Sequence, residues 1–207
     1  MGKALFCTAL IFLLVSCNVS VSVDDEHLGT LSHEKESGQE KMFKEMNMGI
    51  LLTYNLRLTK ADETWVNVWV EGYQDGKPMS PSKLTELSYG FAMNEVEEGN
   101  MGFGIIQPAE GEELFSLYAP GIASAPRRIS NNPLDSEKPY GWGYTMDDEI
   151  TLESGETKVI GAYYQSGKKD EIRSVDLKTE EGIERMITDE NVVLLLKMKV
   201  EQRDPEN

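Results

Sequence analysis

The sequence predicts an all-β fold, an antiparallel β-sandwich with one short helix before the last strand. Apolar and polar side chains alternate over residues 50–59, which is the period of a strand with one buried face. Residues 192–200 form a second strong strand pattern. Glycine, proline and acidic turn signals recur about every 8 to 12 residues, a spacing typical of sandwiches and barrels.

The first half of the chain reads as a series of strands joined by short turns. The predicted strands are 50–59, 65–70, 87–93, 101–105 and 114–119. Turns are expected at 60–63, at Asp75-Gly76 and at 97–100. Two stretches are ambiguous. Residues 82–87 fit a short helix or a strand, and residues 41–48 fit one helical turn or a lead-in to the first strand.

The second half begins with a proline-rich loop, 120–141, of a length that is often functional. The strands predicted after it are 142–145, 149–152, 157–165, 171–177 and 192–200. Residues 179–188 read as a helix, because Ile183, Met186 and Ile187 recur at helical spacing.

The N-terminus has the pattern of a secretory signal. Lys3 precedes an apolar run over 4–15, and the small residues Ser16 and Cys17 follow it. The run is too short to cross a bilayer, which takes roughly 20 residues. An ordinary signal peptide that carries a cysteine near its cleavage site is one interpretation of this pattern.

Leu14-Val15-Ser16-Cys17 resembles the lipobox of bacterial lipoproteins at all four positions. The resemblance implies cleavage before Cys17, a diacylglyceryl group on its sulfur, and a palmitate-type anchor on the extracytoplasmic face of the cell membrane. The corresponding division of the chain is a signal peptide at 1–16, a lipidated cysteine with a flexible acidic tether at 17–40, and a β-sandwich domain at 41–207. A mature chain without a disulfide is compatible with a Gram-positive envelope.

Residues 150–164 resemble a hairpin common in immunoglobulin-like domains of bacterial envelope lipoproteins. The similar part is the Leu-x-x-Gly-Glu turn of residues 152–156 and the strand after it. The resemblance favours an immunoglobulin-like or related sandwich and implies nothing about a ligand.

Composition excludes several classes of function. The chain has 36 acidic against 20 basic residues, so nucleic acid is not an expected partner. Both histidines, His27 and His33, lie in the predicted tether, and Lys41 onward contains neither His nor Cys. Triads and ordinary zinc sites are therefore not expected in the domain, and no metal or cofactor is predicted.

Two groups of residues are candidates for ligand binding. Tyr140, Trp142 and Tyr144 would share one face of a strand, where exposed rings can stack on sugars, although such rings more often pack in a core. Arg127 and Arg128 form an adjacent arginine pair that could bind an anion. Pairing with nearby carboxylates is the favoured interpretation of these arginines.

We therefore expect a non-catalytic binding or interaction module, held at the membrane through diacylglyceryl-Cys17. A basic envelope protein and cell-wall glycan are the expected partners, the first because the chain is acidic. One alternative is a carbohydrate-binding module that uses the aromatic row. Another is a hydrolase with two facing carboxylates, about 5 to 9.5 Å apart.

Overall fold

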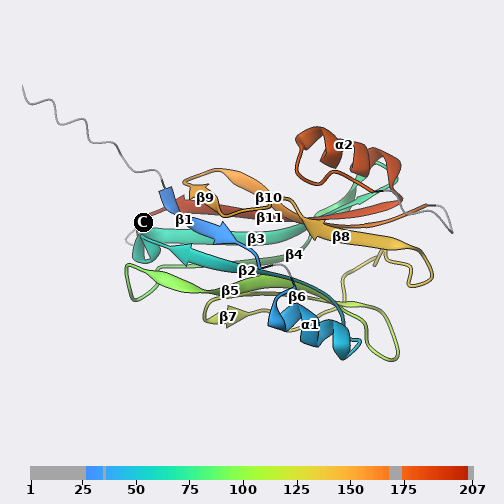
Figure 1. Ribbon diagram of the computed structural model, residues 1–207, viewed down its shortest axis with the longest axis horizontal. Coiled ribbons are helices and arrows are strands. Elements are labelled where there is room, and N and C mark those ends of the chain that lie inside the picture. Colours follow the sequence, from blue (N-terminus) through green and yellow to red (C-terminus); the bar gives the residue numbers. More distant parts are fainter. Residues whose placement is uncertain (1–26, 35, 168–173, 205–207) are drawn as a thin grey trace, which may run out of the picture.

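The computed structural model describes residues 27–34, 36–167 and 174–204, which form two antiparallel sheets packed face to face (Figure 1). The first sheet has the order β7-β6-β5-β2-β1-β9 and the second β4-β3-β11-β10-β8. The strands of the first sheet are β1 (His27–Ser32), β2 (Gly49–Leu58), β5 (Glu97–Ile106), β6 (Leu114–Ala119), β7 (Ile122–Ala123) and β9 (Ile150–Glu153). Those of the second are β3 (Thr64–Gln74), β4 (Lys77–Gly90), β8 (Tyr140–Tyr144), β10 (Thr157–Gln165) and β11 (Val192–Gln202). The predicted β-sandwich is confirmed.

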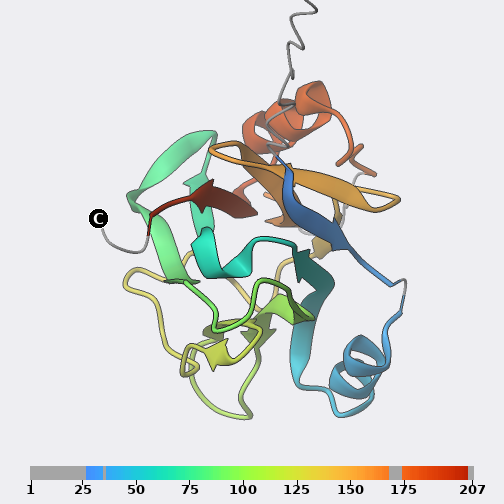
Figure 2. The ribbon, with the colours of Figure 1, turned by 90° about the vertical axis from the view of Figure 1, so that its left-hand side faces the viewer.

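Helices lie outside the two sheets and do not interrupt them (Figures 1 and 2). They are α1 (Gly38–Glu45), the short 3-10 helix η1 (Ala61–Glu63) and α2 (Glu180–Asp189). The predicted helix before the last strand is α2. Thr179 caps it by accepting from the Gly182 N–H at 3.1 Å.

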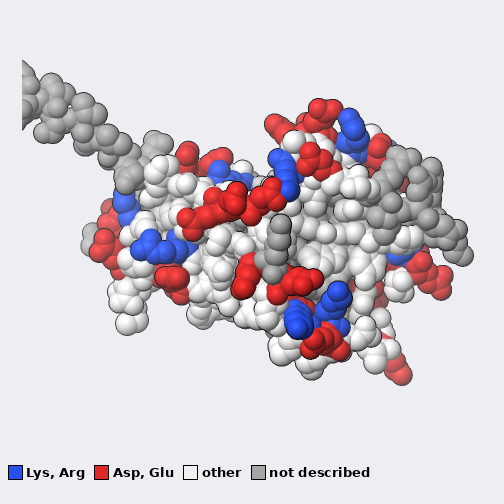
Figure 3. Space-filling model, in the orientation of Figure 1, with Lys and Arg blue, Asp and Glu red and all other residues white. Residues whose placement is uncertain are grey.

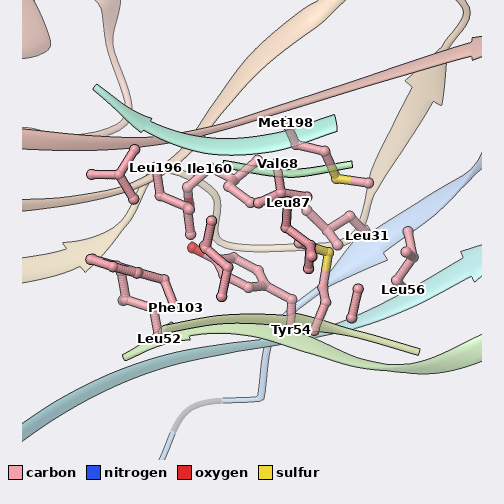
Figure 4. Packing of buried hydrophobic residues seen from close by; sticks show 14 of the residues in the cluster. Leu31, Leu52, Tyr54, Leu56, Val68, Leu87, Phe103, Ile160, Leu196 and Met198 are labelled. Carbon is pink, nitrogen blue, oxygen red and sulfur yellow. The ribbon is translucent and has the colours of Figure 1, made fainter. Parts of the chain in front are cut away.

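The core lies between the sheets and follows the period of two seen in the sequence. Leu52, Tyr54 and Leu56 of β2 point toward Ile160 and Leu196 of the opposite sheet (Figure 4). The hydroxyl of Tyr54 donates to the Ile160 carbonyl at 2.9 Å, so a ring at the centre of the sandwich leaves no polar atom unpaired. A second, smaller apolar cluster fills the space between α2 and the outer face of the second sheet.

The β3–β4 hairpin confirms the turn predicted at Asp75-Gly76. Both residues have positive φ, 49° and 76°, as a tight turn between twisted strands requires. The ambiguous residues 82–87 belong to β4, an edge strand. Pro78 and Pro81 fit there because an edge strand has backbone N–H groups that need no partner in the sheet.

The prediction was wrong at the following connection. The strand expected over 87–93 ends at Gly90, because Phe91 takes a φ of 57° and turns the chain. The turn expected at 97–100 is instead the start of β5, where Glu97 pairs with Leu58 and Asn100 with Asn55. Pairing with β2 outweighs the polar composition of this segment, which suggested a turn.

Residues 27–34 and 36–40 are not a flexible tether, contrary to prediction. Strand β1 pairs with both β2 and β9, and Leu28 and Leu31 are fully buried. A register shift between His27 and Gly29 breaks the alternation, so the apolar pattern carried no strand signal. The domain therefore includes His27 onward, and residues 1–26, with the lipobox, lie outside the described residues.

The strand predicted at 171–177 falls partly outside the described residues, and 174–177 are not in a strand. The last strand and the strand at 157–165 are confirmed as β11 and β10. These two strands pair along most of their length and form the middle of the second sheet with β3.

Candidate functional site

The predicted aromatic row forms β8, the edge strand of the second sheet. Trp142 is opposite Tyr163 in the β8–β10 ladder, and Tyr163 belongs to the core between the sheets. Directly opposed residues share a face, so the row points to the inner side of the sheet, along one open flank of the sandwich. On the other face of the sheet, Gly141 lies under the ring of Tyr164. A β-carbon at position 141 would be only 2.4 Å from that ring.

Two of the three rings are exposed and one is not. Tyr140 and Trp142 each keep 40% of their surface accessible, whereas Tyr144 packs against the core. Tyr140 stacks on Tyr163, with ring centroids 5.6 Å apart and planes at 25°. Trp142 meets Tyr144 edge to face at 6.4 Å. The flank thus presents two exposed rings, the aromatic platform, supported by the buried ring of Tyr163 and the partly buried ring of Tyr144.

Tyr144 connects the platform to the first sheet. Its hydroxyl accepts the backbone N–H of Thr53 at 3.1 Å and donates to the carboxylate of Glu40 on α1. Strand β1 ends at Ser32 and pairs with β2 no farther than Asn55, so Thr53 has no β1 residue opposite it. The Tyr144 hydroxyl therefore accepts the Thr53 N–H where a neighbouring strand would otherwise do so, and this bond links β8 to β2.

His33 covers the other side of Tyr144. The two rings are parallel, with centroids 4.0 Å apart, and the imidazole Nε2 donates to the Met146 carbonyl at 3.0 Å. Within the described residues the Nδ1 atom is buried without a hydrogen-bond partner. The expectation of a domain without histidine is therefore wrong, because β1 carries His33 into the fold.

Burial raises the pKa of the Glu40 carboxyl, and the hydrogen bond from Tyr144 opposes that rise. The pKa of Tyr144 is also raised, first by burial and then by Glu40, so the phenol stays protonated and keeps donating. Sequence reasoning missed Glu40 and His33 because it assigned both to the tether. The capping-box spacing of Ser37 and Glu40 was the available signal, and Ser37 Oγ accepts from the Glu40 N–H at 3.2 Å.

The long connection over 120–141 holds Tyr140 in place. The side-chain amide of Gln165 makes two hydrogen bonds to the backbone of Asp135. Its oxygen accepts from the Asp135 N–H at 3.0 Å, and its nitrogen donates to the Asp135 carbonyl at 3.0 Å. The same Gln165 amide donates to the Tyr163 hydroxyl at 2.8 Å. The ring on which Tyr140 stacks and the loop that leads to Tyr140 are therefore fixed by one side chain.

Arg127 and Arg128 do not form a joint anion site. The two side chains have different neighbours. Arg127 donates to the Thr85 hydroxyl at 3.1 Å. The guanidinium of Arg128 lies beside Gly111, where a β-carbon would be 3.0 Å from its Nη2 atom. The expected pairing with carboxylates is wrong, since neither arginine has an ion pair among the described residues. Arg127 instead helps to close the opposite flank, where Ile129 enters the core.

Few charged side chains lie over β8 on the face seen in Figure 3. Acidic and basic side chains form separate groups on this face, and the visible surface over β8 lies largely between them (Figure 3). The nearby acidic Asp147 is paired with Lys178. An apolar area with a polar surround is a common mark of a binding surface.

The site contains groups for ring stacking and hydrogen bonding. In the described part of the chain, His33 makes its one hydrogen bond to a main-chain carbonyl and not to a hydroxyl or thiol. No cluster of three or more His, Cys, Asp or Glu side chains suited to a metal ion occurs over the same residues. No helix in the described residues is both long enough and apolar enough to cross a membrane.

These features define the chain as an antiparallel β-sandwich with an aromatic platform on one flank. Residues 44–200 match the family described as the YgaN domain, and the chain belongs to that family. The matched region starts within α1, so β1 with His33 and the helix residue Glu40 precede it. No curated protein and no solved structure matches the chain.

Proposed function

We propose that this protein is a non-catalytic binding module on the extracytoplasmic face of the cell membrane, and that it binds its ligand on the β8 flank. The exposed pair of Tyr140 and Trp142 carries this proposal. Burial of apolar surface is favourable by about 25 cal/mol per Å², and the fold leaves part of this stabilisation unused at these two rings. A ligand that covers the rings would gain it. The rigid support beneath the pair lowers the entropy lost on binding.

Cell-wall glycan is the ligand class that the platform favours. Side chains at i and i+2 of a strand lie about 6.6 Å apart, so two rings offer a continuous apolar strip. The surroundings over β8 are largely uncharged (Figure 3), which suits a neutral ring-shaped ligand better than a charged one. Stacking on such a strip needs no nucleophile or metal.

The test is binding of the purified chain to insoluble cell-wall glycan. Trp142→Ala is expected to reduce the bound fraction at least as much as Tyr140→Ala, because indole has the larger face. Met93→Ala is the matched control, since Met93 is 99% exposed in the loop after β4, and β4 is the edge of the second sheet opposite β8. Equal binding by all three variants would refute the platform. Release of soluble fragments from the glycan would instead favour the carboxylate hydrolase.

A basic envelope protein is the second candidate partner. The formal net charge of −16 supports it, because long-range attraction accelerates encounters with cationic surfaces. The two candidates respond differently to salt. Binding to a basic protein is expected to weaken steeply between low and physiological ionic strength, whereas ring stacking is expected to change little.

Membrane attachment through diacylglyceryl-Cys17 is the remaining part of the proposal, and the lipobox at 14–17 supports it. Two acyl chains hold a protein firmly where a single chain does not. Mass spectrometry of native protein is expected to show a mature chain that begins at lipidated Cys17. Cys17→Ala is expected to move the protein from the membrane fraction; an unmodified thiol at Cys17 would refute the anchor.

A further inference from the structure

The loop between β4 and β5 presents an apolar tip to solvent. Met93 is 99% exposed and Val96 is 46% exposed. Two such side chains within four residues make a small protruding apolar surface. It is separate from the β8 flank, because β4 and β8 are opposite edges of the second sheet.

The tip is held firmly on both sides. Ala92 N–H donates to the Ala61 carbonyl at 3.0 Å, and Ala61 N–H donates to the Glu95 carbonyl at 2.7 Å. Phe91 packs on Trp65, with ring centroids 5.5 Å apart. These contacts tie the base of the loop to η1 and leave Met93 pointing outward, so its exposure is a feature of the folded state.

The tip lies at the end of the sandwich where the N-terminal segment enters. Thr59 N–H donates to the carbonyl of Leu28 at 3.0 Å, and two residues later Ala61 bonds to the loop. Leu58 also pairs with Glu97, at the start of β5. The beginning of β1 and the last residues of β11 lie at this end of the sandwich, which faces the viewer in Figure 2.

We propose that Met93 and Val96 contact the membrane interface and set the orientation of the domain on it. This inference rests on the proposed anchor at Cys17. Residues 18–26 separate Cys17 from His27, and ten residue steps span at most about 35 Å when fully extended. The end that carries Met93 is thereby kept near the bilayer, while the far ends of β3, β8 and β10 point away from it.

Charge argues that the contact is apolar. Asp62, Glu63 and Glu95 lie on or next to the elements that hold the tip, and an anionic lipid surface repels carboxylates. Contact is therefore expected to be closer on vesicles of zwitterionic phosphatidylcholine than on vesicles that contain phosphatidylglycerol. Long-range attraction of the domain to anionic lipid would give the reverse order.

The experiment uses the lipidated full-length chain on such vesicles. Because Cys7 leaves with the signal and Cys17 is blocked by lipid, an introduced cysteine is the single free thiol of the mature protein. Asn94→Cys places an environment-sensitive dye beside Met93. Ser136→Cys places the same dye toward the other end, beyond the roughly 33 Å length of β3.

A blue shift of the dye at 94, with quenching by brominated lipid, and neither effect at 136, is the expected result. Adding Met93→Ser to Asn94→Cys is expected to reduce both the shift and the quenching. Unquenched dye at 94 on protein whose Cys17 is shown to be lipidated would overturn the inference and leave the anchor intact. Protein that carries a free thiol at Cys17 would instead refute the anchor.

Discussion

The imidazole of His33 lies flat against the phenol ring of Tyr144, with the ring planes 5° apart. The two residues come from different sheets of the sandwich: His33 directly follows β1 of the first sheet, and Tyr144 is the last residue of β8 in the second. Their contact, with the hydroxyl bonds of Tyr144, closes the flank on which the platform is built. The platform is therefore coupled to the N-terminal segment of the fold.

Tyr144→Phe is expected to destabilise the protein by about 1–3 kcal/mol, because it leaves the Thr53 N–H and the Glu40 carboxylate without their shared partner. Urea unfolding followed by circular dichroism measures the change. Tyr140→Phe is the control and is expected to change stability by less than about 0.5 kcal/mol, since it modifies an exposed ring. Equal effects of the two substitutions would contradict the role of the Tyr144 hydroxyl.

Glu40→Gln is expected to alter how stability depends on pH. Burial raises the folded-state pKa of Glu40 above 4.5, so the native chain takes up this proton before the unfolded chain does. The contribution of Glu40 is therefore most favourable at low pH and is lost as pH rises through the folded-state pKa.

The difference in unfolding free energy between wild type and Glu40→Gln measures this contribution across the pH range. It is expected to fall as pH rises from 4.5 toward neutrality. A difference that grows with pH would show that the hydrogen bond from Tyr144 outweighs desolvation at this carboxylate.

Gly141→Ala is expected to displace β8, because a β-carbon there would lie 2.4 Å from the ring of Tyr164. Overpacking of this kind costs typically about 1–3 kcal/mol. Glycan binding is expected to weaken together with stability, since Tyr140 and Trp142 flank the substitution. Thermal unfolding and the glycan assay measure the two effects.

Gly143→Ala is the matched control for this substitution. Its β-carbon would meet a methyl of Leu177 at 3.0 Å, which a flexible side chain can relieve. A larger loss for Gly143→Ala than for Gly141→Ala would contradict the packing argument.

The boundary of the domain can be tested by truncation. A chain that begins at His27 is expected to unfold cooperatively. A chain that begins at Lys41 is expected to be less stable, because it lacks β1 and with it the buried side chains of Leu28 and Leu31. Burying two leucines contributes about 3–6 kcal/mol, which is a large part of typical domain stability. Denaturant unfolding and near-ultraviolet circular dichroism distinguish the two chains. Equal stability would mean that β1 is dispensable.

Local patterns predicted most of the sandwich. Three features each depend on no more than about ten neighbouring residues: the alternation in β2, the Asp75-Gly76 turn and the helix α2. They could therefore be predicted without knowledge of the fold. Strand β1 was missed because an irregularity at His27 and Gly29 disrupts its alternation. Glu97 and Asn100 suggested a turn, but their partners on β2 make them a strand.

The candidate site was predicted in part. The shared face of Tyr140, Trp142 and Tyr144 was predicted from the period of two, which is local. The predicted strand began at Trp142 and left Tyr140 in the loop, whereas β8 begins at Tyr140. Its division into two exposed rings and one partly buried ring depends on His33 and Glu40, which are distant from Tyr144 in the sequence. The divergence of Arg127 and Arg128 likewise depends on the separate surroundings that each one meets.

By itself the sequence determined most of the strands, the late helix, the acidic surface and a lipobox-like N-terminus, because each depends on neighbouring residues or on composition. The tertiary structure decided that His33 and Glu40 belong to the domain, that Tyr144 is a support rather than a contact surface, and that Met93 projects beside the entry of the chain. Side-chain exposure is the outcome of contacts between distant segments. Periodicity can therefore assign a residue to a face but cannot tell what lies against that face.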